Sequence, residues 1–222
     1  MIPADRYFVK ICGITTEEDA LLAVGLGASA VGFILAPSSR QIAASRVADI
    51  VKRLPQGTVS IGVFRDEAPQ RVVDIVAHAG LTGAQLHGHE TPATTQYVSE
   101  RVGLVIKAFP AASPRLHEAD QFGADLVLVD SPQPGSGRLV DFAALEGLGD
   151  ASRLILAGGL TPDNVTEAIQ RVSPFGVDVA TGVESSPGVK DPRKVAAFIS
   201  AARAAAPVPP EMTEEPFDWR HR

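Results

Sequence analysis

The sequence is poor in cysteine and has no excess of positive charge. Cys12 is the single cysteine among 222 residues, so no disulfide can form within the chain, and a reducing compartment such as the cytoplasm is the simple expectation. The formal net charge is -6, whereas proteins that bind duplex nucleic acid or a membrane surface are more often basic. We therefore expect a cytoplasmic protein with neither nucleic acid nor membrane as a partner.

The beginning of the chain lacks the basic segment and long apolar stretch of a signal peptide. One uncharged run, from Ala20 to Ser39, is long enough to cross a bilayer. However, glycines and Pro37 interrupt it, which indicates the end of a helix, a turn and a buried strand instead. Hydrophobic residues make up 45% of the chain and charged residues 21%, as is usual for a soluble globular protein.

Short apolar runs rich in β-branched residues recur at intervals of roughly 20 to 30 residues, the length of one strand–helix unit. Most of them are solidly apolar, as strands are when helices cover both faces of a parallel sheet. The eight runs are 7–12, 30–35, 59–64, 83–86, 104–108, 126–130, 154–157 and 177–180.

Helix signals fill the gaps between these runs. Residues 15–18 (Thr-Thr-Glu-Glu) predict a capping box, and the pairs Thr161-Pro162 and Asp191-Pro192 each predict an N-cap followed by proline in the first helical position. Eight strands with eight crossovers fit a (βα)8 TIM barrel, which typically has about 250 residues and tolerates about 200. A doubly wound open sheet would share this local pattern. We expect a single-domain barrel over residues 1–205 and a Pro-rich surface or flexible tail over 206–222.

The placement of polar residues favours the barrel, because chemistry in a barrel sits at the carboxyl ends of its strands. Functional groups follow five of the predicted strands, which chance packing does not readily explain. They are Lys10 with Cys12, His87, Asp130, the pair Gly158-Gly159, and Asp178 with Thr181 and Gly182.

Cys12 is the candidate general base. Side chains alternate along a strand, so Lys10 and Cys12 share a face, and a nearby ammonium favours the thiolate. On this interpretation Cys12 is a stronger base than a free cysteine. The alternative is a small buried hydrophobe, which is the commonest fate of a free cysteine.

Asp130 is the candidate general acid. It ends the segment 125–130, where four apolar residues precede it, and partial burial at the rim of a core would help it to hold a proton near neutral pH. The alternative is an aspartate that caps or anchors a loop. A base and an acid on two strands suit a proton shuttle between carbon and oxygen.

The glycines after the seventh and eighth strands are candidate phosphate ligands. Gly158, Gly159 and Gly182 would expose backbone N–H groups to an anion, and barrels commonly bind phosphate at these two loops. The alternative is a pair of tight turns. His87 and His89 have the spacing of two residues on one strand face, but no third metal ligand is convincingly placed, so contact with substrate or a loop is the better interpretation of His87.

These residues also carry a resemblance to a known family. The segment 10–15 (KICGIT) resembles the opening signature of the phosphoribosylanthranilate isomerases, and so do 31–33, 62–64, 85–88, 156–160 and 176–191 at family-like spacing. The resemblance spans roughly residues 7–203.

The resemblance implies a (βα)8 barrel that isomerises N-(5-phosphoribosyl)anthranilate to the aminoketose by an Amadori rearrangement in tryptophan biosynthesis. It implies that Cys12 is the base, Asp130 the acid and Arg40 the cation that holds the anthranilate carboxylate, and it places Gly158, Gly159 and Gly182 in the phosphate loops. His87 and Asp178 are further candidate substrate contacts, and Thr181 a further phosphate contact. The reaction has no redox step, so we expect no cofactor and no metal, with a phosphosugar as the partner of a monomer or homodimer.

Other functions remain open at this point. The histidine-pathway isomerase and bifunctional relatives resemble this barrel but use an aspartate where Cys12 stands. A non-catalytic phosphate-binding barrel would be expected to lose the acid or the base, and this chain has both. Indole-glycerol phosphate synthase would need a lysine and glutamate constellation that we do not find. Arg40 is expected to point into solvent until a substrate carboxylate is bound, because the loop before it is short and polar.

Overall fold

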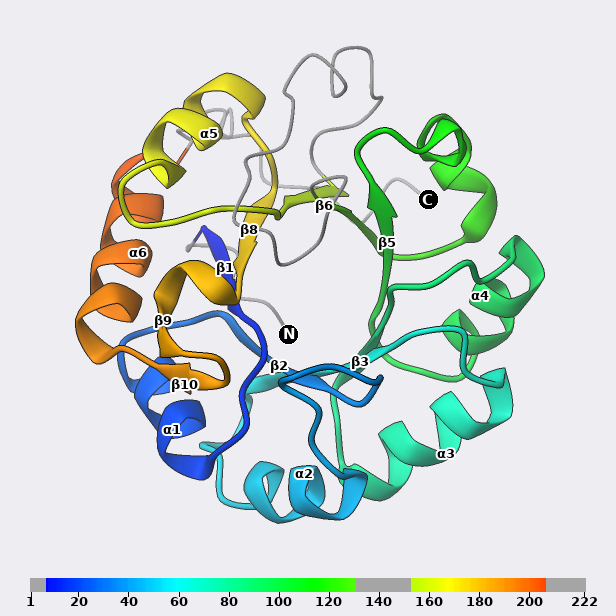
Figure 1. Cartoon of the computed structure of the whole chain (residues 1–222). Coiled ribbons are helices and arrows are strands. Elements are labelled where there is room, and N and C mark those ends of the chain that lie inside the picture. The colour runs from blue at the N-terminus through cyan, green and yellow to red at the C-terminus, as the bar shows by residue number, and fades with distance from the viewer. Residues whose placement is uncertain (1–6, 131–152, 207–222) are drawn as a thin grey trace, which may run out of the picture.

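Eight parallel strands close into a barrel, as Figure 1 shows along its axis. The computed structural model describes residues 7–130 and 153–206. Each strand pairs with its neighbours in chain order, and β8 closes the ring on β1. The strands are β1 (Phe8–Ile11), β2 (Ala30–Ile34), β3 (Val59–Phe64), β4 (Gly83–Leu86), β5 (Val105–Pro110), β6 (Leu126–Asp130), β7 (Leu154–Leu156) and β8 (Gly176–Val179). The predicted barrel is confirmed, and every predicted strand lies within two residues of an observed one.

Two apolar layers hold the barrel together. One buried cluster lies inside the ring and includes Phe8, Ile61 and Ile106, and a larger one lies between the strands and the surrounding helices. Successive side chains of β1 alternate between these layers, since Phe8 belongs to the first cluster and Val9 to the second. Lys10 therefore points into the barrel.

Helices surround the barrel as an outer ring (Figure 1). Thr16 caps the first helix by accepting a hydrogen bond from the Asp19 backbone, and Asp191 caps the last, with Pro192 in the first turn. The predicted cap at Asp191 is thus confirmed, and the cap predicted within residues 15–18 lies at Thr16, with Asp19 in place of Glu18 as the third helical residue. The helices are α1 (Glu17–Gly25), α2 (Ala44–Val51), α3 (Pro69–Ala79), α4 (Pro92–Ser99), the 3-10 helix η1 (Pro114–Phe122), α5 (Val165–Val172) and α6 (Pro192–Ala204).

The predicted start of α5 was wrong. The helix begins at Val165, not at Pro162. The side chain of Asn164 accepts a hydrogen bond from the Thr161 backbone N–H and donates one to the Gly159 carbonyl. This side chain holds the 159–164 segment as a turn and so delays the helix.

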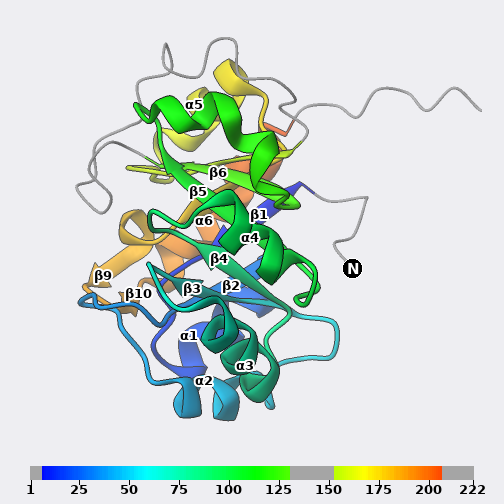
Figure 2. The ribbon, with the colours of Figure 1, turned by 90° about the vertical axis from the view of Figure 1, so that its right-hand side faces the viewer.

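A short 3-10 helix and a hairpin follow β8 and were not predicted. They are η4 (Thr181–Val183) and the antiparallel strands β9 (Glu184–Ser186) and β10 (Val189–Lys190). Pro187 and Gly188 form the turn between the strands, and Gly188 has a φ of 83°, which favours glycine. Figure 2 shows the hairpin at one end of the barrel. Only η4 separates it from β8 in the chain, so this is the end at which β8 finishes.

The uncharged run 20–39 contains the end of α1, a turn and buried β2, as predicted. Within residues 7–130 and 153–206, no helix has the length and apolar character needed to cross a membrane. The 207–222 part of the predicted tail lies outside the described residues, so the boundary between barrel and tail stays a prediction.

Candidate active site

Cys12 lies at the carboxyl end of β1, against a buried ion pair. Lys10 is fully buried, and its Nζ lies 2.9 Å from Oδ1 of Asp178 on β8. Gly32 on β2 leaves room for the thiol, since a Cβ there would lie 2.8 Å from Cys12 Sγ and 3.1 Å from Lys10 Nζ. Lys10 and Cys12 thus share the barrel interior. Asp178, predicted as a substrate contact, lies in the same cluster as the partner of Lys10.

The electrostatic balance at Cys12 differs from the prediction. Burial raises the pKa of the thiol most strongly and Asp178 raises it further, and together they outweigh Lys10 and Lys190, which lower it. Burial also lowers the pKa of Lys10, but Asp178 and Cys12 reverse that shift. The expected net preference for the thiolate was therefore wrong, because desolvation exceeds the attraction of one ammonium that is already paired.

We expect the Cys12 thiol to titrate above its ordinary value of 9.0. Thiolate absorbance near 240 nm measures this directly, because the chain has no other cysteine. The Lys10→Met variant should titrate still higher, since it removes the ammonium that favours the thiolate. A midpoint below 8 in the wild-type protein would show that Lys10 outweighs burial after all.

Asp130, the last residue of β6, faces His87 from β4. The residue is 8% exposed, and its Oδ2 lies 3.4 Å from Nε2 of His87. On the other side of the ring, Nδ1 lies 3.0 Å from Nε2 of Gln85, which is buried in the barrel. The structure therefore brings two predicted site residues together and adds a third that was not predicted.

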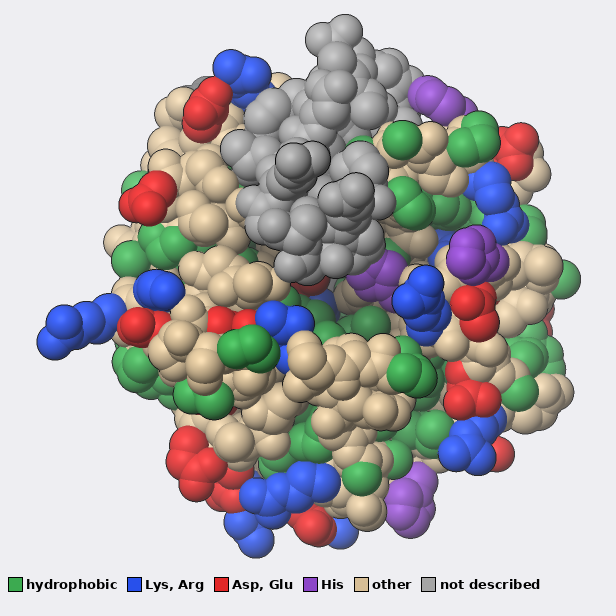
Figure 3. Space-filling model, in the orientation of Figure 1, with side chains coloured by type: hydrophobic (Ala, Val, Ile, Leu, Met, Phe, Trp, Pro, Cys, Tyr) green, Lys and Arg blue, Asp and Glu red, His purple; other side chains and the backbone are tan. Residues whose placement is uncertain are grey.

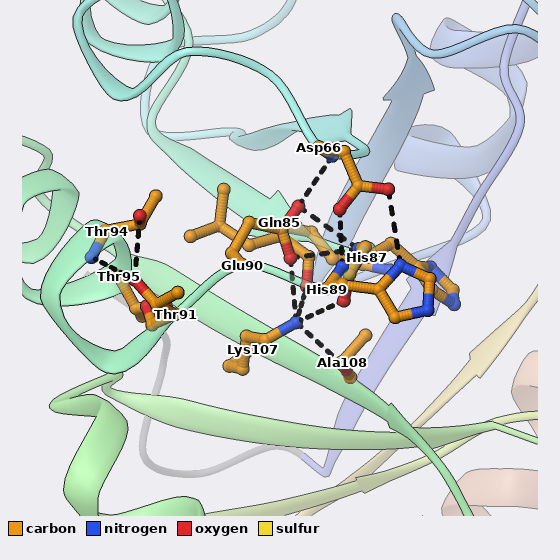
Figure 4. Close-up of polar contacts among 12 residues, drawn as sticks. Asp66, Gln85, His87, His89, Glu90, Thr91, Thr94, Thr95, Lys107 and Ala108 are labelled. Atoms are coloured by element: carbon orange, nitrogen blue, oxygen red, sulfur yellow. Dashed lines mark hydrogen bonds and ion pairs between the residues drawn. The ribbon is translucent and has the colours of Figure 1, made fainter.

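A buried ion pair supports the backbone on both sides of His87 (Figure 4). Lys107 Nζ on β5 lies 2.8 Å from Glu90 Oε2 and donates to the carbonyls of Leu86 and Gly88. The Glu90 carboxylate in turn accepts hydrogen bonds from the backbone N–H of Gly88. Both charged side chains are at most 2% exposed, so loss of either would leave a buried charge unpaired, a costly change.

Arg40 does not point into solvent, which corrects the prediction. Its Nε and one terminal nitrogen each lie 2.7 Å from an oxygen of Glu184 at the start of β9, and its side chain is 15% exposed. Lys190 lies 3.0 Å from the same carboxylate. Burial raises the pKa of Glu184, but hydrogen bonds and charge from Arg40 and Lys190 outweigh it and hold the pKa below its ordinary value. The buried carboxylate of Glu184 therefore holds the guanidinium of Arg40 by two charge-assisted hydrogen bonds.

Arg40 also closes over the loop that carries Cys12. A Cβ on Gly13 would lie 2.8 Å from the Arg40 side chain. One terminal nitrogen of Arg40 faces the Ser39 hydroxyl at 3.3 Å, and the other faces Thr181 at 3.5 Å. The predicted carboxylate-binding cation therefore extends to the predicted phosphate loop, nearer to it than the sequence interpretation supposed.

The predicted phosphate loops lie against each other. Gly158 and Gly159 follow β7 with φ of 86° and 67°, conformations that favour glycine. Gly182 in η4 lies so close to the Leu160 carbonyl that a Cβ would overlap it. Glycine is thus required at the contact between the two loops, whether or not an anion is bound.

His89 is separate from the buried residues around Cys12 and Asp130. Its side chain is 86% exposed and lies 3.4 Å from Asp66. The described part of the chain contains no group of three His, Cys, Asp or Glu residues that could hold a metal ion.

Sequence reasoning assigned no role to Gln85, Glu90, Lys107, Glu184 or Lys190. Gln85 stands inside a predicted strand, where a polar residue at an inward position was an available signal. Lys107 shares the outer face of β5 with Val105 and Phe109, and there the signal was a charged residue within an apolar strand. The signal was weaker for the others, because charged residues in loops are usually exposed. Figure 3 shows the face viewed in Figure 1, with a hollow near its middle. Basic side chains, histidine side chains and hydrophobic side chains surround this hollow.

Comparison with known proteins supports the resemblance. Residues 9–201 match the family model described as N-(5'phosphoribosyl)anthranilate (PRA) isomerase. The N-(5'-phosphoribosyl)anthranilate isomerase of Desulforudis audaxviator is 44% identical over 204 residues, which cover 89% of this chain and 98% of that protein.

Two solved structures are also similar. The phosphoribosyl anthranilate isomerase of Thermus thermophilus is 42% identical, with a TM-score of 0.80, 89% of this chain covered and 98% of the other. A second isomerase, solved with reduced 1-(o-carboxyphenylamino)-1-deoxyribulose 5-phosphate, is 38% identical at the same coverage with a TM-score of 0.78. The match of motifs, nearly complete coverage and barrel show that this chain belongs to the N-(5'-phosphoribosyl)anthranilate isomerase family.

Proposed function

We propose that Cys12 and Asp130 carry out the family's reaction in this chain, the conversion of N-(5'-phosphoribosyl)anthranilate to 1-(2-carboxyphenylamino)-1-deoxyribulose 5-phosphate. Membership of the family gives the activity itself: the chain is a phosphoribosylanthranilate isomerase of tryptophan biosynthesis. The roles of individual residues rest on the geometry at the carboxyl ends of β1, β4, β6 and β8. The observation that carries them is that a thiol and a carboxyl group, Cys12 and Asp130, stand at the ends of two strands of the same closed barrel.

Asp130 opens the sugar ring. The protonated carboxyl group gives its proton to the ring oxygen as the bond from that oxygen to C1' breaks, and the anthranilate nitrogen supplies the electron pair that forms the iminium. The substrate then carries a positive charge beside its C2'–H bond, which makes that proton more acidic.

Cys12 removes the C2' proton. The electron pair of the C2'–H bond forms the C1'=C2' double bond, and the iminium π pair returns to nitrogen, which gives an enolamine. The enolamine gains a proton at C1' and loses the proton of its 2' hydroxyl to become the ketone. Burial raises the pKa of Cys12, so the thiolate is scarce in the free protein. The iminium charge favours the thiolate at the moment when the base is needed.

The two ends of the substrate fit two kinds of group. Glycines 158, 159 and 182 offer backbone N–H groups to the phosphate. Glu184 occupies the Nε edge of Arg40, and a guanidinium has five N–H donors. The terminal donors that Glu184 does not occupy are therefore the ones that a substrate carboxylate would take. Held in this way, Arg40 is oriented before the substrate arrives.

A complex with the reduced product analogue tests the arrangement. We expect the phosphate at residues 158–159 and 181–182, with the carboxylate on the outer edge of the Arg40 fork while Glu184 keeps the inner edge. A phosphate on the loops after β1 to β4 would contradict both the phosphate site and the orientation of the substrate.

Arg40→Ala is expected to raise KM about 10-fold or more with a much smaller change in kcat. The reason is that a carboxylate contact of this kind holds substrate and transition state about equally. Arg40→Lys should recover only part of the loss, because an ammonium cannot form the fork with Glu184. Steady-state kinetics of both variants and of the wild type measure the change in KM. Arg71→Ala, at an exposed position on α3, is the control. An unchanged KM for Arg40→Ala would mean that another group binds the anthranilate end.

The remaining expectations concern the environment of the protein. We propose a cytoplasmic enzyme that works without cofactor or metal, as a monomer or homodimer, since an acid and a base suffice for an isomerisation without redox change. Sedimentation equilibrium would distinguish monomer from dimer. The histidine-pathway alternative is disfavoured by the thiol at position 12 and by the family match.

A further inference from the structure

We propose that Gln85 and His87 form a relay with Asp130 in which the orientation of the Gln85 carboxamide follows the protonation of the His87–Asp130 pair. The inference rests on the proposed role of Asp130 as the acid. It starts from three side chains in line at the ends of β4 and β6. Gln85 Nε2 lies 3.0 Å from His87 Nδ1, and His87 Nε2 lies 3.4 Å from Asp130 Oδ2.

The hydrogen bond from Gln85 fixes the tautomer of His87. An amide nitrogen donates and does not accept, so Nδ1 must accept, and the ring carries its proton on Nε2. That proton points at the Asp130 carboxylate. This arrangement matches Asp130 after it has given its proton away, because the protonated Nε2 then lies 3.4 Å from a charged carboxylate oxygen.

A half-turn of the carboxamide gives the opposite arrangement. Gln85 Oε1 would then face Nδ1 and accept a hydrogen bond from it, so Nδ1 carries the ring proton and Nε2 is bare. Asp130 in its protonated form adds one further proton, which lies between its Oδ2 and Nε2. That proton is the one that Asp130 needs as an acid. The two arrangements therefore differ by one proton and a rotation of the Gln85 amide.

No hydrogen bond within the described residues holds the oxygen of the Gln85 amide in place. Gln85 is 1% exposed, and its Oε1 is a buried acceptor with no hydrogen-bond partner among the described residues. Such a group is unusual in a folded protein and calls for an explanation. The half-turn would give this oxygen a partner each time the His87–Asp130 pair holds the additional proton.

The surroundings of His87 keep the relay in line. Lys107 donates to the carbonyls of Leu86 and Gly88, the residues on either side of His87, at 3.1 and 2.9 Å. Glu90 pairs with Lys107 and accepts from the Gly88 N–H. These contacts lie on the backbone beside His87 (Figure 4), while the imidazole ring faces Gln85 and Asp130. Gln85 thus acts through His87 as a positioning residue.

The first test reads the tautomer of His87 by long-range ¹H–¹⁵N correlation in labelled protein. The signals are assigned by their loss in His87→Asn, since the chain has five histidines. We expect a proton on Nε2 and a bare Nδ1 in the wild-type protein without substrate. In Gln85→Glu the carboxylate can only accept, so Nδ1 should carry a proton. The same tautomer in both proteins would overturn the proposal, and this measurement needs no substrate.

The second test separates positioning from folding. Gln85→Met keeps the size of the side chain and removes the amide, and with it the hydrogen bond to His87 Nδ1. We expect kcat to fall about 10-fold and KM to change less than threefold. The control Gln96→Met, which removes a surface amide that donates to the Gln121 carbonyl on another element, should leave both unchanged. Wild-type kcat in folded Gln85→Met would overturn the relay. If Gln85→Met does not fold, the tautomer in Gln85→Glu decides. Absence of turnover in the wild-type protein would instead count against the proposed function.

Discussion

Asp130→Asn is expected to lower kcat about 10³-fold while the affinity for the reduced product analogue stays within a few fold. Loss of a positioned general acid typically costs 10²- to 10⁴-fold. Asparagine has nearly the same shape and can still accept from His87 Nε2, 3.4 Å away in the wild-type protein, but it has no proton to give to the ring oxygen. Single-turnover kinetics and analogue binding measure the two effects separately.

The analogue is the control for a structural role of Asp130. The side chain is 8% exposed, and a buried carboxylate often anchors a loop. An equal collapse of kcat and analogue affinity in Asp130→Asn would identify Asp130 as such an anchor. The acid would then have to be sought elsewhere at the rim of the barrel.

Cys12→Ser is expected to lower kcat by about 10²-fold or more with little change in thermal stability. The hydroxyl fits the space that Gly32 leaves for the thiol, so the ion pair of Lys10 with Asp178 should be kept. A serine hydroxyl is a far poorer base than a thiol under the same conditions, so removal of the C2' proton becomes slow. Steady-state kinetics with thermal unfolding of the same sample distinguishes chemistry from folding.

Substrate deuterated at C2' sharpens this test. If proton removal limits the rate in Cys12→Ser, the deuterated substrate should react several-fold more slowly than the ordinary one. A folded Cys12→Ser protein with near-normal turnover would contradict the assignment of Cys12 as the base. The free thiol would then be a small buried hydrophobe.

The barrel was predictable because its signal is local and repeated. Solid apolar strands and the caps at Thr16 and Asp191 are encoded within a few residues, and the structure confirms them. The start of α5 was mispredicted because the Asn164 side chain bonds the Thr161 N–H and the Gly159 carbonyl and holds this segment as a turn. The β9–β10 hairpin was missed because its strands have only three and two residues.

The residues that belong to the site could be predicted from the sequence better than the contacts they make with one another. Lys10 and Cys12 could be placed on one face because their separation along a strand is short. By contrast, Arg40 and Glu184 are 144 residues apart, and a single sequence gives no sign of that pairing. The pKa of Cys12 was misjudged for a related reason. Burial and Asp178 come from the assembled barrel, whereas only Lys10 is close in sequence.

Turnover of freshly prepared phosphoribosylanthranilate by the purified chain tests the central claim most directly. The reaction is followed by the loss of anthranilate fluorescence, with the Asp130→Asn protein as the matched control. The proposed chemistry predicts rapid, saturable loss of fluorescence with the wild-type protein, without added metal or cofactor, and loss close to the uncatalysed rate with Asp130→Asn. No turnover by folded wild-type protein, or equal turnover by the two proteins, would contradict it.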